Sequence, residues 1–259
     1  MFYFIKHSKK LSKKILKYIN SSNLSSILIT IDVFSLIEQM KLAGPDSLSI
    51  SIITAFFVSM VFTLQIVKEM LYLNTVNIIG AVLALAFIRE LSPVLTAVIL
   101  IGRVASSYAA ELATMKVTEQ LNALYLLETN PLLYLILPRV LASILMLPIL
   151  NLISFVTSIA GSIFICFVFY RIDPNLFLIS VFSVISIIDI IKSCVKMFFF
   201  SLAVSIISCL YGLSATGGAY GVGRSTTNAV VSCLLVVFIL DFILSYLMFS
   251  HLDSSIKSF

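Results

Sequence analysis

The chain has 259 residues, of which 60% are hydrophobic and only 11% are charged. Soluble domains carry about 25% charged residues, so this chain lacks the polar side chains needed to cover a water-exposed surface. Its mean hydropathy of +1.13 indicates an integral membrane protein, and its long apolar runs predict helices rather than the alternating strands of a barrel. We therefore exclude a soluble enzyme and expect an all-α membrane protein.

The formal net charge of +5 is concentrated near the N-terminus. Six lysines lie at positions 6, 9, 10, 13, 14 and 17, and no acidic residue accompanies them. Apolar residues separate these lysines at three- and four-residue spacing, which is typical of an amphipathic helix at a membrane surface and not of a signal peptide. We predict a basic amphipathic interfacial region over residues 1–44, with a plain targeting or tail segment as the alternative.

Five apolar runs are each long enough to cross a hydrocarbon core of ~30 Å, which takes about 20 helical residues. The predicted spans cover residues 47–67, 78–102, 140–169, 195–213 and 229–249. A shorter apolar stretch, 176–191, carries Asp189; we interpret it as interfacial or re-entrant, and a full crossing stays open. Residues 45–250 form the predicted membrane domain, followed by a short tail at 251–259.

The lysine-rich region predicts the orientation, because positive residues stay on the cytosolic or stromal side of a membrane. Five spans then place the loops 103–139 and 214–228 on that side, and the C-terminus on the other. The loop 103–139 is rich in good helix formers, so we expect a helix that lies against the membrane or a partner. A solvated connecting helix is the alternative.

Three ionisable residues lie inside the apolar spans: Arg89, Glu90 and Asp241. Such groups cost at least about 2.5–3.5 kcal/mol at a helix centre, so they usually face a cavity or a partner. Arg89 and Glu90 point about 100° apart on a helix and do not simply neutralise each other. We predict that Glu90 and Gln65 line a polar spot along a transport path. Arg89 and Asp241 are expected to form structural inter-helix pairs or to belong to the same path.

A glycine-rich stretch lies between the fourth and fifth predicted spans. Its residues are Gly217, Gly218, Gly221, Gly223 and Arg224. It is not a nucleotide-binding loop, since no Walker lysine with a following Ser or Thr is present. We predict a tight turn that uses glycine for positive φ, with the hydroxyls of 225–227 capping the last helix.

Cysteine and histidine are too dispersed to suggest a reactive centre. The four cysteines contain no CxxC pair, and the two histidines lie near opposite ends of the chain. We therefore predict no catalytic residue, no metal site and no cofactor.

Three strings of residues resemble the MlaE/YrbE-type permeases, the membrane subunits of lipid-handling ABC transporters associated with MCE proteins, including the plastid envelope lipid permease. They are RELSPVLTAVILIGRVASSYAAELATMKVTEQLNAL (Arg89–Leu124), NPLLYLILPRVLA (Asn130–Ala142) and GGAYGVGRSTTNAVV (Gly217–Val231), followed by LDF at Leu240–Phe242. The resemblance extends over about residues 45 to 250, and the strings occur in the family's order.

The resemblance implies a homodimer that moves phospholipid across or between membranes. Each copy would rest on a cytosolic ABC ATPase through a coupling helix between spans two and three, here Ala105 to Leu127. The coupling residues would be Arg103, Glu111, Met115, Lys116, Glu119, Gln120 and Leu124. The glycine-rich turn would touch the ATPase side, and an MCE-domain lipid-binding protein would act on the far face. ATP hydrolysis would belong to the partner chain, and no nucleic acid is expected.

The abundance of Ile, Lys, Asn, Phe and Ser is typical of AT-rich coding. Together with the resemblance, this favours a plastid (chloroplast) membrane, with a bacterial inner membrane as the alternative. Two other functions stay open on the sequence. A secondary transporter would use Glu90 and Asp241 as proton or ion sites, and a membrane assembly or scaffold protein would transport nothing.

Overall fold

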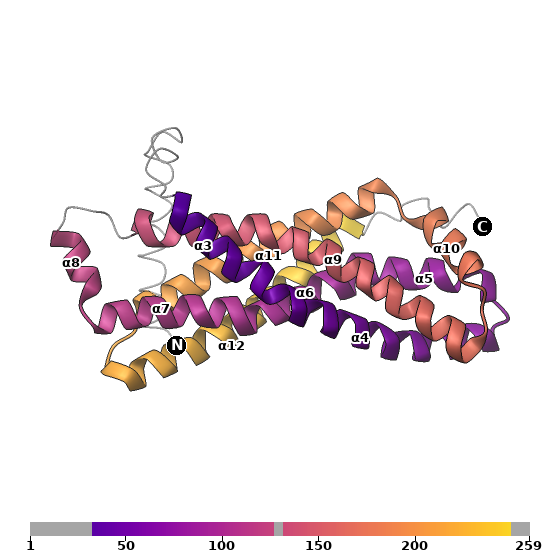
Figure 1. Cartoon of the computed structure of the whole chain (residues 1–259), viewed down its shortest axis with the longest axis horizontal. Coiled ribbons are helices and arrows are strands. Elements are labelled where there is room, and N and C mark those ends of the chain that lie inside the picture. Colours follow the sequence, from indigo (N-terminus) through magenta and orange to yellow (C-terminus); the bar gives the residue numbers. More distant parts are fainter. Residues whose placement is uncertain (1–32, 127–131, 250–259) are drawn as a thin grey trace. The chain divides into compact units, whose positions relative to one another are not determined.

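The computed structural model describes residues 33–126 and 132–249 (Figure 1). Within these ranges the chain is helical and contains no strand, as the composition predicts. Most of the predicted amphipathic N-terminal region and the whole predicted tail at 251–259 lie outside the described residues.

The helices follow one another with short connections. They are α3 (Val33–Ala43), α4 (Pro45–Tyr72), α5 (Ile79–Ala86), α6 (Ser92–Leu100), α7 (Ser106–Val117), α8 (Gln120–Leu126), α9 (Leu137–Tyr170), α10 (Pro174–Val184), α11 (Ile187–Leu213) and α12 (Gly218–Phe249). A 3-10 turn, η1 (Val76–Ile78), precedes α5, and π-helical segments are η2 (Phe87–Leu91), η3 (Ile101–Ala105) and η4 (Leu132–Ile136). Segments of this kind often occur at functional sites, and η2 contains two of the predicted site residues.

Five helical runs in the described part of the chain are long and apolar enough to cross a membrane. They are Val33–Tyr72, Val76–Val117, Tyr134–Tyr170, Ile187–Leu213 and Gly218–Met248. The predicted number of spans is therefore confirmed. The first four predicted spans lie inside these longer runs, and the fifth, 229–249, ends one residue beyond Met248. The predicted bounds refer to the membrane rather than to helix ends, and they stay predictions.

The ambiguous stretch 176–191 is divided between two helices. Helix α10 has 11 residues and a length of about 16 Å, too short to cross a hydrocarbon core. The chain then breaks, and α11 begins at Ile187, earlier than the predicted fourth span. Ser186 Oγ accepts a hydrogen bond from the backbone N–H of Asp189 at 3.2 Å, which caps α11. Asp189 therefore belongs to the fourth spanning helix.

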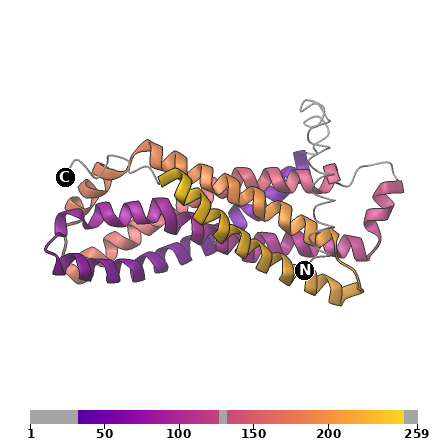
Figure 2. The same cartoon turned by 180° about the vertical axis from the view of Figure 1, so that it is seen from behind.

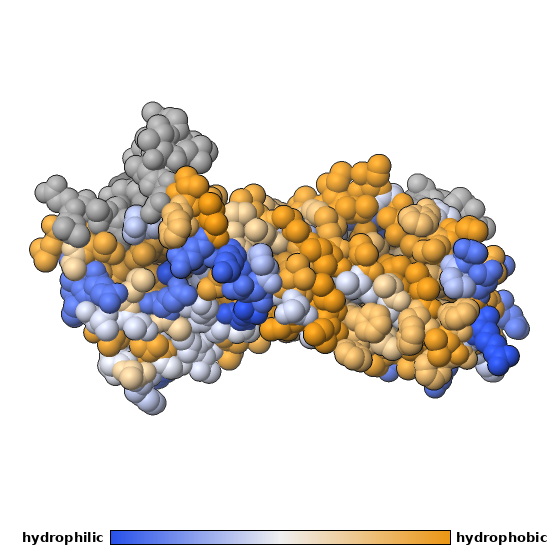
Figure 3. Space-filling model, viewed as in Figure 1, coloured by the Kyte–Doolittle hydropathy of each residue, from blue (hydrophilic) through white to orange (hydrophobic). Residues whose placement is uncertain are grey.

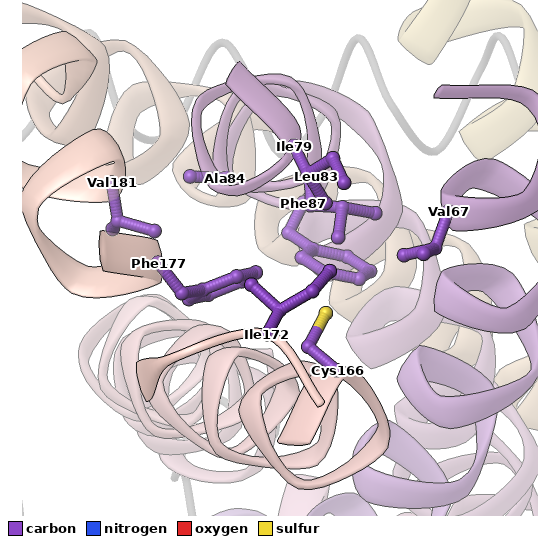
Figure 4. Close-up of a cluster of buried hydrophobic side chains, with 9 residues drawn as sticks. All are labelled: Val67, Ile79, Leu83, Ala84, Phe87, Cys166, Ile172, Phe177 and Val181. Carbon is purple, nitrogen blue, oxygen red and sulfur yellow. The ribbon is translucent and has the colours of Figure 1, made fainter. Parts of the chain in front are cut away.

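The described chain divides into two compact units. Unit 1 contains residues 33–43, 101–126, 132–145 and 202–235, and unit 2 contains 44–100, 146–201 and 236–249. The apolar core of unit 2 is drawn in Figure 4, where side chains of α4, α5, η2, α9 and α10 converge. Its buried members are Val67, Ile79, Leu83, Ala84, Phe87, Cys166, Ile172, Phe177 and Val181.

Helix α10 packs directly on α5 in unit 2, and the two lie side by side in both views (Figures 1 and 2). A Cβ atom at Gly80 would lie 2.2 Å from Ser180 Oγ and 2.6 Å from the carbonyl oxygen of Phe177. Glycine at position 80 therefore permits the close approach. The side of unit 2 seen in Figure 3 is mostly hydrophobic, as contact with lipid requires.

Helices α4 and α9 meet along a row of small polar residues in unit 2. The buried residues of α4 recur every four positions: Ser47, Ser51, Ala55, Ser59, Thr63 and Val67. Ser51 Oγ lies 2.7 Å from Ser154 Oγ, and Thr63 donates to Ser162 at 2.9 Å. Small residues and inter-helix hydrogen bonds are the usual means of close helix packing in lipid.

In unit 1, the end of α7 lies beside the end of α11. A Cβ atom at Gly212 would lie 2.7 Å from the Cβ of Leu112, and Lys116 Nζ donates a hydrogen bond to the carbonyl oxygen of Leu213. The loops after the second and fourth spans therefore begin at the same end of this unit, in agreement with the predicted topology.

Candidate functional site

Two consecutive charged residues of the π-helical segment η2 both reach α11 within unit 2. Arg89 Nη2 lies 3.0 Å from Asp189 Oδ1, and Glu90 Oε2 lies 2.7 Å from Lys196 Nζ. Asp189 and Lys196 are seven residues apart, about two helical turns, so they lie on one face of α11. The order of charges on η2 is therefore matched by the opposite charges on α11.

Lys196 is the centre of this arrangement and is fully buried. Its Nζ also lies 2.6 Å from Asp241 Oδ1, 2.8 Å from Ser245 Oγ and 3.0 Å from the carbonyl oxygen of Arg89. Lysine has three N–H donors, and Glu90, Ser245 and the carbonyl oxygen of Arg89 accept them, while Asp241 contributes an ion pair. We call Arg89, Glu90, Asp189, Lys196, Asp241 and Ser245 the charge cluster; it joins η2, α11 and α12.

A second polar group lies in the same helices of unit 2. Ser92 Oγ donates to Asn151 Oδ1 at 2.8 Å, and Asn151 Nδ2 donates to Ser193 Oγ at 2.8 Å. All three side chains are buried. Ser92 is two residues from Glu90 and Ser193 three from Lys196, so the polar interior continues from the charge cluster onto α6 and α9.

The structure brings the predicted residues Arg89, Glu90 and Asp241 together through Lys196, which the sequence interpretation overlooked although it lies inside the predicted span 195–213. A lysine in an apolar run is itself the signal that could have identified it. The other predicted path residue, Gln65, lies exposed on α4 in a groove lined by Phe57, Val58, Val61 and Phe62. No contact between Gln65 and the charge cluster is recorded among the described residues.

The predicted single coupling helix from Ala105 to Leu127 is wrong. The structure has two helices, α7 and α8, separated at Thr118 and Glu119, and Glu119 has a φ of 60°. Helix α7 continues the second long apolar run, and its residues Tyr108 and Leu112 are fully buried. We call residues 118–136, between α7 and α9, the connecting segment.

The predicted coupling residues lie in three places. Glu119 and Gln120 are exposed at the start of the connecting segment, and Leu124 is half-buried on α8. Glu111, Met115 and Lys116 instead contact other parts of unit 1. Met115 packs on the apolar cluster of Leu112, Ile136 and Cys209. Arg103 is half-buried within η3.

Glu111 of α7 forms an ion pair with Arg139 of α9, the two helices that flank the connecting segment. Arg139, almost fully buried at the start of α9, donates from Nη2 to Glu111 Oε2 at 2.7 Å. The guanidinium carbon of Arg139 lies 5.7 Å from the ring centre of Tyr108, within the range of a cation–π contact. The other oxygen of Glu111 accepts from Ser107 at 2.8 Å. Sequence interpretation missed Arg139 because it lies between two predicted elements.

The glycine-rich turn forms as predicted at its start. Gly217 and Gly218 have φ of 92° and 70°, which favour glycine. A Cβ at Gly221 would lie 1.9 Å from the carbonyl oxygen of Thr216, whereas at Gly223 it would meet nothing within 4 Å. Arg224 is exposed beside a pocket of about 580 Å³.

Helix α12 already begins at Gly218, so the hydroxyls of 225–227 lie inside it and bond back to carbonyls of the preceding turn. The prediction that they cap the last helix is wrong.

Known proteins match almost the whole chain. The family described as permease MlaE matches residues 36–247. A probable ABC transporter permease protein of Pyropia yezoensis is 53% identical over 228 residues, 88% of this chain and 87% of that protein. One from Synechocystis sp. is 50% identical over 213 residues, 82% of this chain and 81% of that protein. Protein trigalactosyldiacylglycerol 1, chloroplastic, of Arabidopsis thaliana is 44% identical over 222 residues, 86% of this chain and 63% of that protein.

Five helices long enough to cross a membrane, together with chloroplast and bacterial relatives, make the chain a multi-pass protein of a plastid or bacterial inner membrane. The match to the family extends over all five of these helices and both units. The chain belongs to the MlaE permease family and is an ABC transporter permease.

Proposed function

We propose that this permease moves a glycerophospholipid or a related lipid across or between membranes, in a plastid membrane, and that a separate ATPase chain supplies the energy. The chain would act as a homodimer, with an MCE-domain protein delivering or receiving lipid on the far face. The Arabidopsis relative, whose name contains a glycerolipid, supports the substrate class.

The observation that carries the proposal is the charge cluster inside the apolar helices of unit 2. A transporter of lipid needs an apolar surface for acyl chains and polar groups for a headgroup. Glu90 supplies such a group, because 44% of its side chain is exposed while its partner Lys196 is buried. Glu90 therefore stays a candidate for the lipid path, and Lys196 and Asp241 hold it in position.

The connecting segment is the candidate contact for the ATPase. Glu119, Gln120 and Asn122 are exposed there, so their side chains are available to a partner. Arg139 of α9 and Glu111 of α7 form an ion pair beside the two ends of the segment, so a force on its exposed residues would be passed to both helices. We expect Glu119 and Gln120 to touch the ATPase, and Glu111, Met115 and Lys116 to transmit the movement.

A proton- or ion-coupled secondary transporter is the second candidate, favoured by one observation. Two carboxylates that share a buried lysine are an arrangement found in proton relays of membrane proteins. The relatives named ABC transporter permeases favour the first candidate. Dependence of transport on an ATPase chain separates the two.

The test is affinity purification of the chain in mild detergent, followed by mass spectrometry of the proteins and lipids that purify with it. The proposal expects an ABC ATPase, an MCE-domain protein and glycerolipid. Deletion of the gene for the ATPase found in this way must abolish lipid movement. Transport that persists after the deletion would support the second candidate, and a chain that purifies without lipid or ATPase would contradict the proposal.

A further inference from the structure

A single charged side chain lies in the part of unit 1 where α11 ends and α12 begins. Residues 202–235 contain no acidic residue, and Arg224 is the only charged residue among them. Arg224 is exposed on the second turn of α12, and within the described residues it forms no ion pair. This end of unit 1 therefore presents a cation whose counter-charge the described part of the chain does not supply.

Two pockets flank one face of α12, with volumes of about 580 Å³ and 450 Å³. Both volumes are in the range of small-molecule sites, about 300–1,000 Å³. Three residues line both pockets: Tyr220, Arg224 and Asn228. They are spaced four residues apart, so they follow one face of the helix. Arg224 therefore lies between two pockets rather than on an open surface.

The hydrogen-bond donors of this surface differ in whether they are already engaged. Ser214 and Ser225, which also line the larger pocket, donate to backbone carbonyls at 2.8 Å and 2.9 Å. The side chains of Tyr220, Arg224 and Asn228 form no hydrogen bond among the described residues. A guanidinium, an amide and a phenolic hydroxyl together offer several donors and one positive charge. This set fits an anion with several oxygen atoms, and a phosphate is such an anion.

The position of Arg224 along α12 is that of a lipid phosphate. The predicted fifth span begins at Ala229, and five helical residues place Arg224 about 7.5 Å before it. The headgroup layer outside the hydrocarbon core is about 5–7.5 Å thick on each side of a bilayer. Tyrosine, here Tyr220, is enriched at the same level. On these bounds Arg224 lies among the phosphate groups of the membrane surface.

The same face of α12 continues as an apolar surface. Val231 and Leu235 follow Arg224 by seven and eleven residues, which is close to two and three helical turns. Val231 is 51% exposed and Leu235 is 59% exposed. From Ala229 to Leu235 the helix rises about 9 Å, which is within the ~15 Å depth of one leaflet. The face thus offers a cation at headgroup level and apolar side chains directly beneath it.

We propose that this face of α12 binds one phospholipid of the adjoining leaflet, with its phosphate on Arg224 and an acyl chain along Val231 and Leu235. We call it the phospholipid face; its residues are Tyr220, Arg224, Asn228, Val231 and Leu235. A carboxylate of a protein partner would pair with Arg224 without using the apolar residues beneath it, so their continuity favours a lipid. The inference goes beyond the proposed function, because a lipid would occupy this face whether or not the permease moves lipid.

The experiment cross-links the full-length permease, in mild detergent, to phosphatidylglycerol that carries a photoreactive group on its headgroup. Mass spectrometry of the peptides locates the label, and we expect it on residues 211–235. Unlabelled phosphatidylglycerol should compete for this label roughly tenfold better than a galactolipid with the same acyl chains, which has no phosphate. Inorganic phosphate at the concentration of the competing lipid should not displace the label, because it lacks an acyl chain.

Three variants test the role of the cation. Arg224→Gln should lower the label on residues 211–235 roughly tenfold. Arg224→Lys keeps the charge but loses the fork of a guanidinium, so it should retain part of the label. Lys68→Gln removes an exposed cation of α4 and should leave the label intact. Because Arg224 is exposed and has no ion pair within the described residues, its variants should keep the unfolding temperature of the wild type.

Absence of label from residues 211–235 of the wild-type protein would overturn the inference, and this arm needs no variant to fold. Equal competition by the galactolipid, or displacement by inorganic phosphate, would overturn it as well, since the phosphate or the acyl chain would then play no part. Unchanged labelling of Arg224→Gln would do the same, and loss of the ATPase or of the second copy from that variant would assign the face to a protein partner. No readout depends on transport, so the inference and the proposed function fail separately.

Discussion

Arg139 and Glu111 form an ion pair of 2.7 Å that joins the first turn of α9 to the middle of α7 in unit 1. The connecting segment follows α7 and precedes α9, so the pair holds together the two helices that flank the segment. Tyr108 supports the pair from α7, with its hydroxyl 3.4 Å from the carbonyl oxygen of Arg139. The geometry makes the pair a candidate link between the exposed residues at the start of the segment and the spanning helices.

Arg139→Gln removes the cation from this pair. We expect a loss of stability of about 1.5–3 kcal/mol, the usual contribution of a hydrogen bond to a charged group, and ATP hydrolysis by the partner that no longer depends on lipid. Thermal unfolding in detergent and the ratio of ATP hydrolysed to lipid moved measure the two effects. The exchange Glu111→Arg with Arg139→Glu should restore part of both. An exchange no better than the single variant would contradict the link.

Lys196→Met leaves two carboxylates of the charge cluster without their cation. The removal of one partner of a buried ion pair typically costs about 3–5 kcal/mol, so we expect a large fall in unfolding temperature. The triple variant Lys196→Met, Glu90→Gln and Asp241→Asn should recover most of the loss because no unpaired charge remains. Lys68→Met, on an exposed residue of α4, is the control. A triple variant as unstable as Lys196→Met would contradict this account.

Gly161→Ala tests the close approach of α4 and α9. A Cβ there would lie 2.3 Å from Ser59 Oγ and 2.9 Å from the carbonyl oxygen of Phe56, so the helices must separate. Overpacking of this kind costs about 1–3 kcal/mol. Gly102→Ala, where a Cβ meets nothing within 4 Å, should leave stability unchanged or slightly raised. Equal unfolding temperatures for the two variants would argue against tight packing of α4 on α9.

Glu119→Lys reverses an exposed charge at the start of the connecting segment. The side chain is exposed and accepts a hydrogen bond from the neighbouring exposed Asn122, so the fold should tolerate the change. We expect transport to be abolished while the permease still assembles as a dimer, because the contact with the ATPase is lost. Lipid transport and the size of the complex measure these outcomes, with Glu69→Lys as the control. Wild-type transport by Glu119→Lys would remove this residue from the contact.

The five spans could be predicted from hydropathy because a helix that crosses lipid must be apolar over about 20 residues. It also predicted that the loops after spans two and four share one side, which the contact of Lys116 with Leu213 supports. The break between α7 and α8 was not predictable from local pattern. Thr118 and Glu119 carry no glycine or proline signal, and Glu119 adopts a positive φ that is uncommon for residues other than glycine.

The partners of the intramembrane charges are a tertiary property. The sequence identified Arg89, Glu90 and Asp241 as costly in a membrane but could not pair them, since their ion-pair partners are 45 to 106 residues away along the chain. The apolar stretch 176–191 gives no local sign that the chain breaks between α10 and α11. Asp189 was therefore left in that stretch, although it lies in the first turn of α11. Glu111 was expected to face the ATPase, and only the structure gives its contact with Arg139.

ATP-driven movement of lipid tests the central claim most directly. The permease and the ATPase that purifies with it are placed in vesicles containing fluorescent phosphatidylcholine, and loss of the lipid to acceptor vesicles is measured with ATP and with a non-hydrolysable analogue. We predict transfer that requires hydrolysis and is lost in Lys196→Met and Glu119→Lys but kept in Lys68→Met and Glu69→Lys. Transfer that is equal with ATP and the analogue, or no transfer by the assembled wild-type complex, would contradict the account.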